Sequence, residues 1–186
     1  MSSAEELAMS LQFELRGIHA LIWDDQYDLV RALLILRAAA SDLQLRPMLV
    51  PTTEKELAVF CNMLYDSQID NDVLRVLFVP QAANAIVGPW LNGARRPLSR
   101  PPGTLLLVRD ADFKSFQEYA PDLASFVGPR IYDSASMLSI ASPTTTQRLE
   151  ATLPDDFMVA LRGVPGSRPT RPEIDSWLAT LRPSAS

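Results

Sequence analysis

The chain has 186 residues, of which 47% are hydrophobic and 21% are charged; its formal net charge is -5 and its pI is near 4.9. This length and composition predict one folded domain, with room for a small appendage, and exclude wholesale disorder. The acidic balance gives no overall attraction for nucleic acid or for an anionic membrane, so we expect neither as a partner.

The sequence is typical of a cytoplasmic protein. Its single cysteine, Cys61, excludes an internal disulfide framework and a zinc cluster held by thiolates. Glu5 and Glu6 stand where a secretory signal peptide needs positive charge. No apolar run approaches the roughly 18 residues that a membrane span requires.

The first half of the chain is predicted to alternate between helices and strands. Residues 3–16 open with a capping box and predict a helix. Residues 18–23 are apolar without alternation, which is typical of a strand covered on both faces. Residues 25–43 repeat leucines at helical spacing and predict a mostly buried helix. A strand at 47–50, a helix that begins at the capping box of Thr53 and Glu56, and a strand at 73–79 follow.

The second half contains the least regular segment. After a short helical stretch at 82–87, the prolines, glycines and arginines of residues 88–103 predict a partly extended, exposed connection. A strand at 104–108 and a helix from 113, which Pro121 interrupts, come next. Further elements are predicted at 123–127 (helix), 131–132 (strand) and 134–140 (helix), followed by helices alone at 145–153, 154–162 and 172–181.

Five strands that alternate with helices predict an α/β fold for residues 1–141. We expect a five-stranded, mostly parallel sheet with helices on both faces, an N-terminal helix before it, and a helical C-terminal extension at 142–186. Functional residues in such sheets gather at the carboxyl ends of the strands. The residues expected there are Asp24, Asp25, Thr52, Thr53, Pro80, Gln81, Arg109, Asp110 and Asp133.

The turn after the first strand carries three carboxylates, Asp24, Asp25 and Asp28. A helix N-terminus at this point of an α/β domain often binds phosphate, because it offers unpaired N–H groups and the positive end of the helix dipole. Three carboxylates would satisfy those N–H groups themselves and repel a polyphosphate, and no glycine lets the backbone approach one. We interpret them mainly as helix caps, with a residual site beside Arg109 as the functional alternative.

The sequence lacks the common catalytic and nucleotide-binding motifs. His19 has no second histidine with which to share a metal and is predicted to pack in the core, and Cys61 lies on an apolar helix stripe. Neither GxSxG, GxxxxGK[ST] nor GxGxxG is present. We therefore expect no catalytic residue, no bound cofactor and no bound metal.

The one local basic cluster consists of Arg95, Arg96 and Arg100, and the aromatic Trp90 precedes it closely in sequence. Solvated loop charges are the default interpretation of such a cluster. Tryptophan and arginine are enriched in binding hot spots, however. These four residues are therefore the candidate contact for a protein partner, which includes a second copy of the chain.

From Trp90 onward the chain resembles the second half of the nucleotide-binding domain in bacterial STAND-class and AAA-like P-loop ATPases. WLNGARRPLSRPPGTLLLVRD resembles their helix that feeds a buried strand, with Leu91, Asn92 and Arg95 as the matching residues. EYAPDLASFVGPRIYD resembles the helix with an Ala-Pro-Asp-Leu break that follows, with residues 120–123 matching. In order of elements the match covers about residues 17–141.

The chain departs from those ATPases at the positions that bind nucleotide. Residues 24–28 replace the glycine-rich loop and its lysine, and Pro80 and Gln81 replace the magnesium-binding acid. The resemblance therefore implies a pseudo-NTPase, an inactive member of the group. Its role would be non-catalytic, as a protein-interaction or signalling module of a bacterial signalling or defence system.

A weaker resemblance is to receiver domains of two-component signalling. IWDDQYDLVRALL is similar to their first strand, acidic pair and first helix, with Asp24 and Asp25 matching the magnesium-binding acids. The expected phosphoacceptor at the end of the third strand is replaced by Pro80 or Gln81. An atypical receiver-like domain, or a nucleotide- or metal-dependent hydrolase that uses Asp24 and Asp25, is thus the alternative function.

Overall fold

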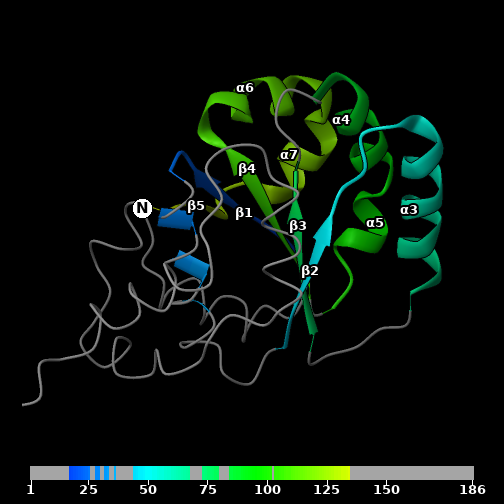
Figure 1. Cartoon of the computed structure of the whole chain (residues 1–186), viewed down its shortest axis with the longest axis horizontal. Helices are drawn as coiled ribbons and strands as arrows, with labels where there is room; N and C mark the ends of the chain where they lie inside the picture. Colours follow the sequence, from blue (N-terminus) through cyan, green and yellow to red (C-terminus); the bar gives the residue numbers. More distant parts are fainter. Residues whose placement is uncertain are drawn as a thin grey trace, which may run out of the picture.

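The structure is a computed structural model that describes residues 17–25, 28, 29, 32, 33, 36, 44–67, 73–79, 84–101 and 103–134. Within these ranges, five strands form one parallel sheet in the order β2-β3-β4-β1-β5 (Figure 1). The strands are β1 (Ile18–Trp23), β2 (Gln44–Leu49), β3 (Val73–Phe78), β4 (Thr104–Arg109) and β5 (Ile131–Asp133). The predicted α/β fold class is confirmed.

The interior strands owe their position to continuous apolar sequence. All six residues of β1 and of β3 are buried, because each strand has a neighbour on both sides and helices on both faces of the sheet. β1 pairs with β4 from Ile18 against Thr104 to Trp23 against Arg109. This register brings the carboxyl ends of the two strands side by side.

β2 is an edge strand and begins three residues earlier than predicted, at Gln44. Its burial is mixed, which matches a strand with one open edge. The N–H of Val50 donates to the Phe78 carbonyl at 3.2 Å, so this position faces β3. Pro47, an odd number of residues earlier, faces outward, where a missing N–H costs no ladder hydrogen bond.

Helices cover both faces of the sheet, in two unequal groups. The described helices α3 (Glu54–Asp66), α4 (Asn84–Gly93), α5 (Arg95–Leu98), α6 (Asp110–Tyr119) and α7 (Pro121–Val127) lie on one face (Figure 1). Their connections all advance along the sheet in one direction, and right-handed crossovers then place them on one face. The β1–β2 connection runs the other way. Its described positions 28, 29, 32, 33 and 36 are helical and lie on the opposite face.

The main hydrophobic core lies between the sheet and the helices α3 to α7. It takes alternate residues from the strands and the inward stripe of each helix. Its members include Ile18, Ala20, Ile22, Leu77, Leu106 and Val108 of the strands and Leu57, Phe60, Leu91, Leu98, Phe116 and Leu123 of the helices.

The prediction of an extended, exposed connection at 88–103 was wrong, because α4 and α5 fill most of this segment. Val87, Leu91, Ala94 and Leu98 are buried and recur at helical spacing, and this packing outweighs the prolines and glycines between them. Pro89 lies on the exposed side of α4. The carbonyl four residues earlier therefore meets solvent where it lacks an N–H partner.

The other predicted elements within the described ranges are confirmed with small shifts. Thr53 caps α3: its hydroxyl accepts the N–H of Glu56 at 3.4 Å and donates to the Glu56 carboxylate at 2.6 Å. The break at Pro121 separates α6 from α7, and Gly128 ends α7. The predicted helices at 3–16, 145–153, 154–162 and 172–181, most of the helix at 134–140, the extension at 142–186, and Pro80 with Gln81 lie outside the described residues.

No described helix combines the length and the apolar character that crossing a membrane requires.

Candidate functional site

The carboxyl ends of β1 and β4 form the crevice where a ligand would be expected. These strands are neighbours, yet the helices that follow them cover opposite faces of the sheet, which defines a topological switch point. Asp24 and Asp25 follow β1, and Arg109 ends β4. The guanidinium carbon of Arg109 lies 6.0 Å from the centroid of the Trp23 ring, within cation–π range. The sequence-predicted residues thus meet at one edge.

Asp25 acts as the N-cap of the helix that follows β1. Its Oδ1 accepts the N–H of Asp28 at 3.1 Å, and its backbone carbonyl accepts the N–H of Leu29 at 3.0 Å. This geometry confirms the capping interpretation for Asp25. The Asp25 carboxylate therefore accepts the hydrogen bond that this N–H group would otherwise donate to a bound phosphate.

Asn84 links the strand-end crevice to α6. Its side-chain N–H donates to the Asp112 carbonyl at 3.1 Å, while its buried Oδ1, like the buried indole N–H of Trp23, has no partner among the described residues. The same residues contain no cluster of three His, Cys, Asp or Glu side chains placed to bind a metal. His19 is 1% exposed, and its ring centroid lies 6.1 Å from that of Tyr132. It packs in the core, as predicted.

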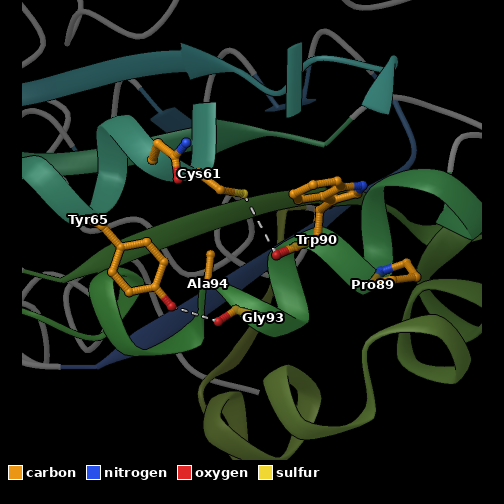
Figure 2. Close-up of a pocket in the computed structure, with 7 residues that line it drawn as sticks. Cys61, Tyr65, Pro89, Trp90, Gly93 and Ala94 are labelled. Atoms are coloured by element: carbon orange, nitrogen blue, oxygen red, sulfur yellow. Dashed lines mark hydrogen bonds between the residues drawn. The ribbon is translucent and has the colours of Figure 1, made fainter. Parts of the chain in front are cut away.

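A second feature, a pocket between α3 and α4, was not predicted. It has a volume of about 350 Å³, and Figure 2 shows its lining: Cys61, Asn62, Tyr65, Pro89, Trp90, Gly93 and Ala94. The Cys61 thiol donates to the Trp90 carbonyl at 3.8 Å, and the Tyr65 hydroxyl donates to the Gly93 carbonyl at 3.1 Å. Burial raises the pKa of the Cys61 thiol above its ordinary value, so it stays protonated at neutral pH.

Exposed apolar side chains extend this pocket into a groove. Ile86 is 46% exposed and precedes Trp90 by one helical turn on the same side of α4. Tyr65, which lines the pocket from α3, is 45% exposed. We call the pocket together with Ile86 the α3–α4 groove. Exposed apolar residues gathered around a hollow are typical of interaction sites.

The arginines of the candidate partner contact have different environments. Arg95 donates to the Asn92 carbonyl at 3.0 Å and lies 3.8 Å from the Asp122 carboxylate, so it holds α5 to its neighbours. Arg100 donates to the Tyr65 carbonyl at 3.2 Å, at the end of α3. Arg96 is exposed, and its side chain makes no hydrogen bond or ion pair to the described residues.

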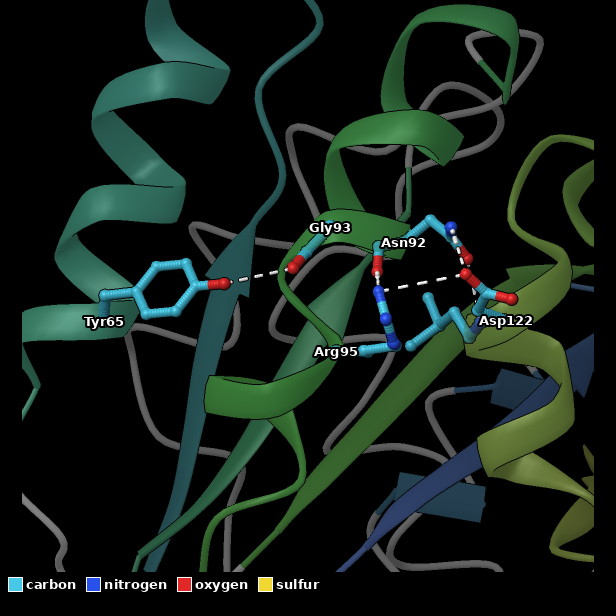
Figure 3. A network of polar contacts seen from close by, with 6 residues as sticks. Tyr65, Asn92, Gly93, Arg95 and Asp122 are labelled. Atoms are coloured by element: carbon cyan, nitrogen blue, oxygen red, sulfur yellow. Dashed lines mark hydrogen bonds and ion pairs between the residues drawn. The ribbon is translucent and has the colours of Figure 1, made fainter.

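The two segments that carry the ATPase resemblance contact each other (Figure 3). Asn92 of the first segment donates from Nδ2 to the Asp122 carboxylate at 3.2 Å, and its Oδ1 accepts the N–H of Leu123 at 2.9 Å. Ala120, at the N-cap of α7, has no side-chain acceptor for this N–H. Asn92 therefore caps α7 from a different helix.

Replacing Asn92 by alanine is expected to lower the free energy of unfolding by about 1–2 kcal/mol, the usual loss for a missing N-cap. Urea denaturation measures the change. Asn62→Ala is the matched control, because Asn62 is an exposed asparagine within α3 whose side chain has no hydrogen bond to the described residues. Equal stability of the two variants would contradict the capping role.

A buried arginine that the sequence did not single out closes α5. Arg75 of β3 donates from Nη2 to the carbonyls of Pro97 at 2.9 Å and Arg100 at 3.2 Å. Burial lowers the pKa of Arg75, and the charges of Arg100 and Arg46 lower it further. Its hydrogen bonds make it a structural residue at a helix C-terminus.

The domain thus presents two separate features, the capped crevice at the ends of β1 and β4 and the open α3–α4 groove. In comparisons with known proteins, no family model matches the chain and no curated protein matches it.

Proposed function

We propose that the chain is a non-catalytic protein-interaction module, built on a P-loop-NTPase-like fold that has lost nucleotide binding and acting in bacterial signalling or defence. One observation carries the proposal: at the topological switch point, the Oδ1 of Asp25 accepts the N–H of Asp28 at 3.1 Å. The N–H groups of a phosphate-binding turn point instead at the ligand, and a lysine assists them.

The charges of this turn oppose a nucleotide as well. Asp24 and Asp25 are both exposed, and each adds a formal negative charge at this turn. Two like unit charges 4 Å apart in water repel by about 1 kcal/mol, and salt screens part of this repulsion. A triphosphate seated here would have to displace the Asp25 cap and overcome such repulsion.

Two further observations favour this origin over the receiver-like alternative. The contact of Asn92 with Asp122 and Leu123 gives both motifs of the ATPase resemblance a structural role that does not require nucleotide. The strand order also places β4 between β1 and β3. Flavodoxin-type sheets, to which receiver domains belong, have the order 2-1-3-4-5, in which β1 and β3 are neighbours.

An interaction role is supported by the α3–α4 groove. An apolar, solvent-open depression between two helices is the kind of surface on which an amphipathic helix docks. Arg96 is exposed and lies two residues after Ala94, the last residue of the chain that lines the pocket. It offers a cationic contact to a partner bound there. The chemistry of these residues favours a protein partner.

Nucleotides with magnesium are expected to leave the melting temperature of the full chain unchanged. A ligand at one hundred times its Kd would add about 2.7 kcal/mol of stability, which a thermal shift titration with ATP and GTP readily detects. Asp24→Ala serves as the control variant. A saturable rise in the wild type that Asp24→Ala abolishes would overturn the proposal and support the hydrolase or receiver-like alternative.

A further inference from the structure

The chain itself contains a segment whose pattern matches the α3–α4 groove. We propose that residues 172–181, PEIDSWLATL, dock into this groove as an amphipathic helix and cover Asn62. The inference rests on the proposed function in one respect, namely that the groove is a protein-docking surface. It adds an occupant, so that an external partner would have to compete with the chain's own segment.

The groove has the dimensions of a helix-docking site. On α4 its wall runs from Ile86 through Trp90 to Gly93, positions separated by one turn each, which spans about 10 Å of helix axis. The pocket volume of about 350 Å³ lies at the lower end of the range of ligand pockets, about 300–1,000 Å³. One large side chain with its neighbours fits such a space.

The segment presents anchors at the matching spacing. Its apolar residues Ile174, Trp177, Leu178 and Leu181 stand at i, i+3, i+4 and i+7, which is the pattern of helices that bind in grooves. Ser176 falls on the opposite side of the same helical wheel. Thr170 and Glu173 have the spacing of a capping box, which predicts a helix start just before this run.

Charge favours one orientation. Glu173 and Asp175 lie in the first turn of segment 172–181 and, with the flanking Arg171, give that end a net charge of −1 (two negative charges and one positive), whereas Arg182 follows the other end. Arg100 donates to the Tyr65 carbonyl at the end of α3. The two positive charges of Arg96 and Arg100 exceed the single negative charge of Asp66, so this end of the groove is net positive. The acidic end of the segment therefore pairs with the Arg96 and Arg100 end of the groove.

The connection is long enough to allow docking. The described chain ends at Ser134, after β5, and residues 135–171 separate it from the segment. The helices predicted at 145–153 and 154–162 would each span about 14 Å at 1.5 Å per residue, and residues outside helices add about 3.3 Å each when extended, so the connection can span more than about 30 Å. This is comparable with the diameter of a small domain, about 30 Å. The groove is within reach from β5 without any change in the sheet.

Asn62 lines the pocket and is exposed, whereas Cys61, the single cysteine of the sequence, is only 6% exposed. The reporter is therefore Asn62→Cys in a chain that also carries Cys61→Ala, and we would measure the rate at which a small maleimide labels position 62 in this folded full-length chain at constant pH, with this chain as the wild-type reference. Leu178→Asp places a charge on the apolar stripe, and Ser176→Asp places the same charge on the opposite side as the matched control. A segment that is docked nine-tenths of the time slows labelling of the cysteine about tenfold. The labelling rate should therefore rise about tenfold in Leu178→Asp. In Ser176→Asp it should stay within about twofold of the wild-type rate.

A second measurement separates loss of docking from loss of folding. A synthetic peptide of residues 170–184 added to Leu178→Asp should slow labelling back toward the wild-type rate, and the same peptide carrying Leu178→Asp should not. Equal labelling rates in the wild type and Leu178→Asp would overturn the proposal. Protection that rises with protein concentration would also overturn it, because a second copy would then cover the groove. None of these outcomes depends on nucleotide, so they are independent of the thermal shift test.

Discussion

Replacing Gly88 by alanine is expected to lower the free energy of unfolding by about 2–3 kcal/mol, in the upper part of the range for overpacked sites. A Cβ at Gly88 would lie 2.6 Å from the Cβ of Tyr119 and 3.1 Å from its carbonyl carbon. Neither atom moves by side-chain rotation. The contact can be relieved only if α4 and α6 separate, which would also shift the wall of the α3–α4 groove.

Gly93 in the same helix provides the matched control. A Cβ built there meets no atom within 4 Å, so alanine gains helix propensity without a clash. We expect Gly93→Ala to raise the free energy of unfolding by up to about 1 kcal/mol. Urea denaturation of both variants gives the two changes under identical conditions. A Gly88→Ala protein as stable as the wild type would contradict the close packing of α4 on α6.

The fold was predictable where burial is continuous. Strands β1, β3 and β4 are apolar along nearly their whole length, and their predicted and observed bounds agree within one residue. The edge strand β2 has exposed polar residues, Gln44 and Arg46, that resemble the end of the preceding helix. Its start was therefore missed, because sequence alone does not distinguish a half-exposed edge strand from a helix terminus.

The error at 88–103 has a different physical origin. Pro89 and the glycines of this segment predict a loop, whereas the apolar positions that recur from Val87 to Leu98 predict helices, and these positions are buried. That recurrence follows the helical period and was the signal that could have found α4 and α5. A proline on the exposed side of a helix destabilises the helix by less free energy than burial of the opposite, apolar side stabilises it.

Sequence reasoning located the strand-end site better than the groove. Asp24, Asp25 and Arg109 meet at one edge because the carboxyl ends of neighbouring parallel strands always do. The groove depends on α3 lying beside α4, which follows only from the observed order of β2, β3 and β4. The contacts that hold Arg95 and Arg100 join residues far apart in sequence, so their structural roles could not be predicted.

Replacing Gly103 by alanine is expected to have the largest effect, a loss of about 3 kcal/mol or more, because it combines backbone strain with a steric clash. Gly103 has φ = 105°, in the region that favours glycine. A Cβ at this position would lie 2.7 Å from the carbonyl oxygen of Gly17. This oxygen accepts the N–H of Thr104 at 3.1 Å, where β1 and β4 begin to pair.

Gly128→Ala separates the two causes of this loss. Gly128 also has a positive φ, of 53°, but a Cβ there meets nothing closer than 3.6 Å. With ψ of −125°, Gly128 has the conformation of the first central residue of a type II′ turn, so alanine should cost only the strain of this glycine-favoured backbone, about 1–3 kcal/mol. The difference between the two losses, measured by urea denaturation, isolates the contact with Gly17. Equal losses would mean that the start of the β1–β4 pair tolerates a side chain, and the register that pairs Trp23 with Arg109 would then need another cause.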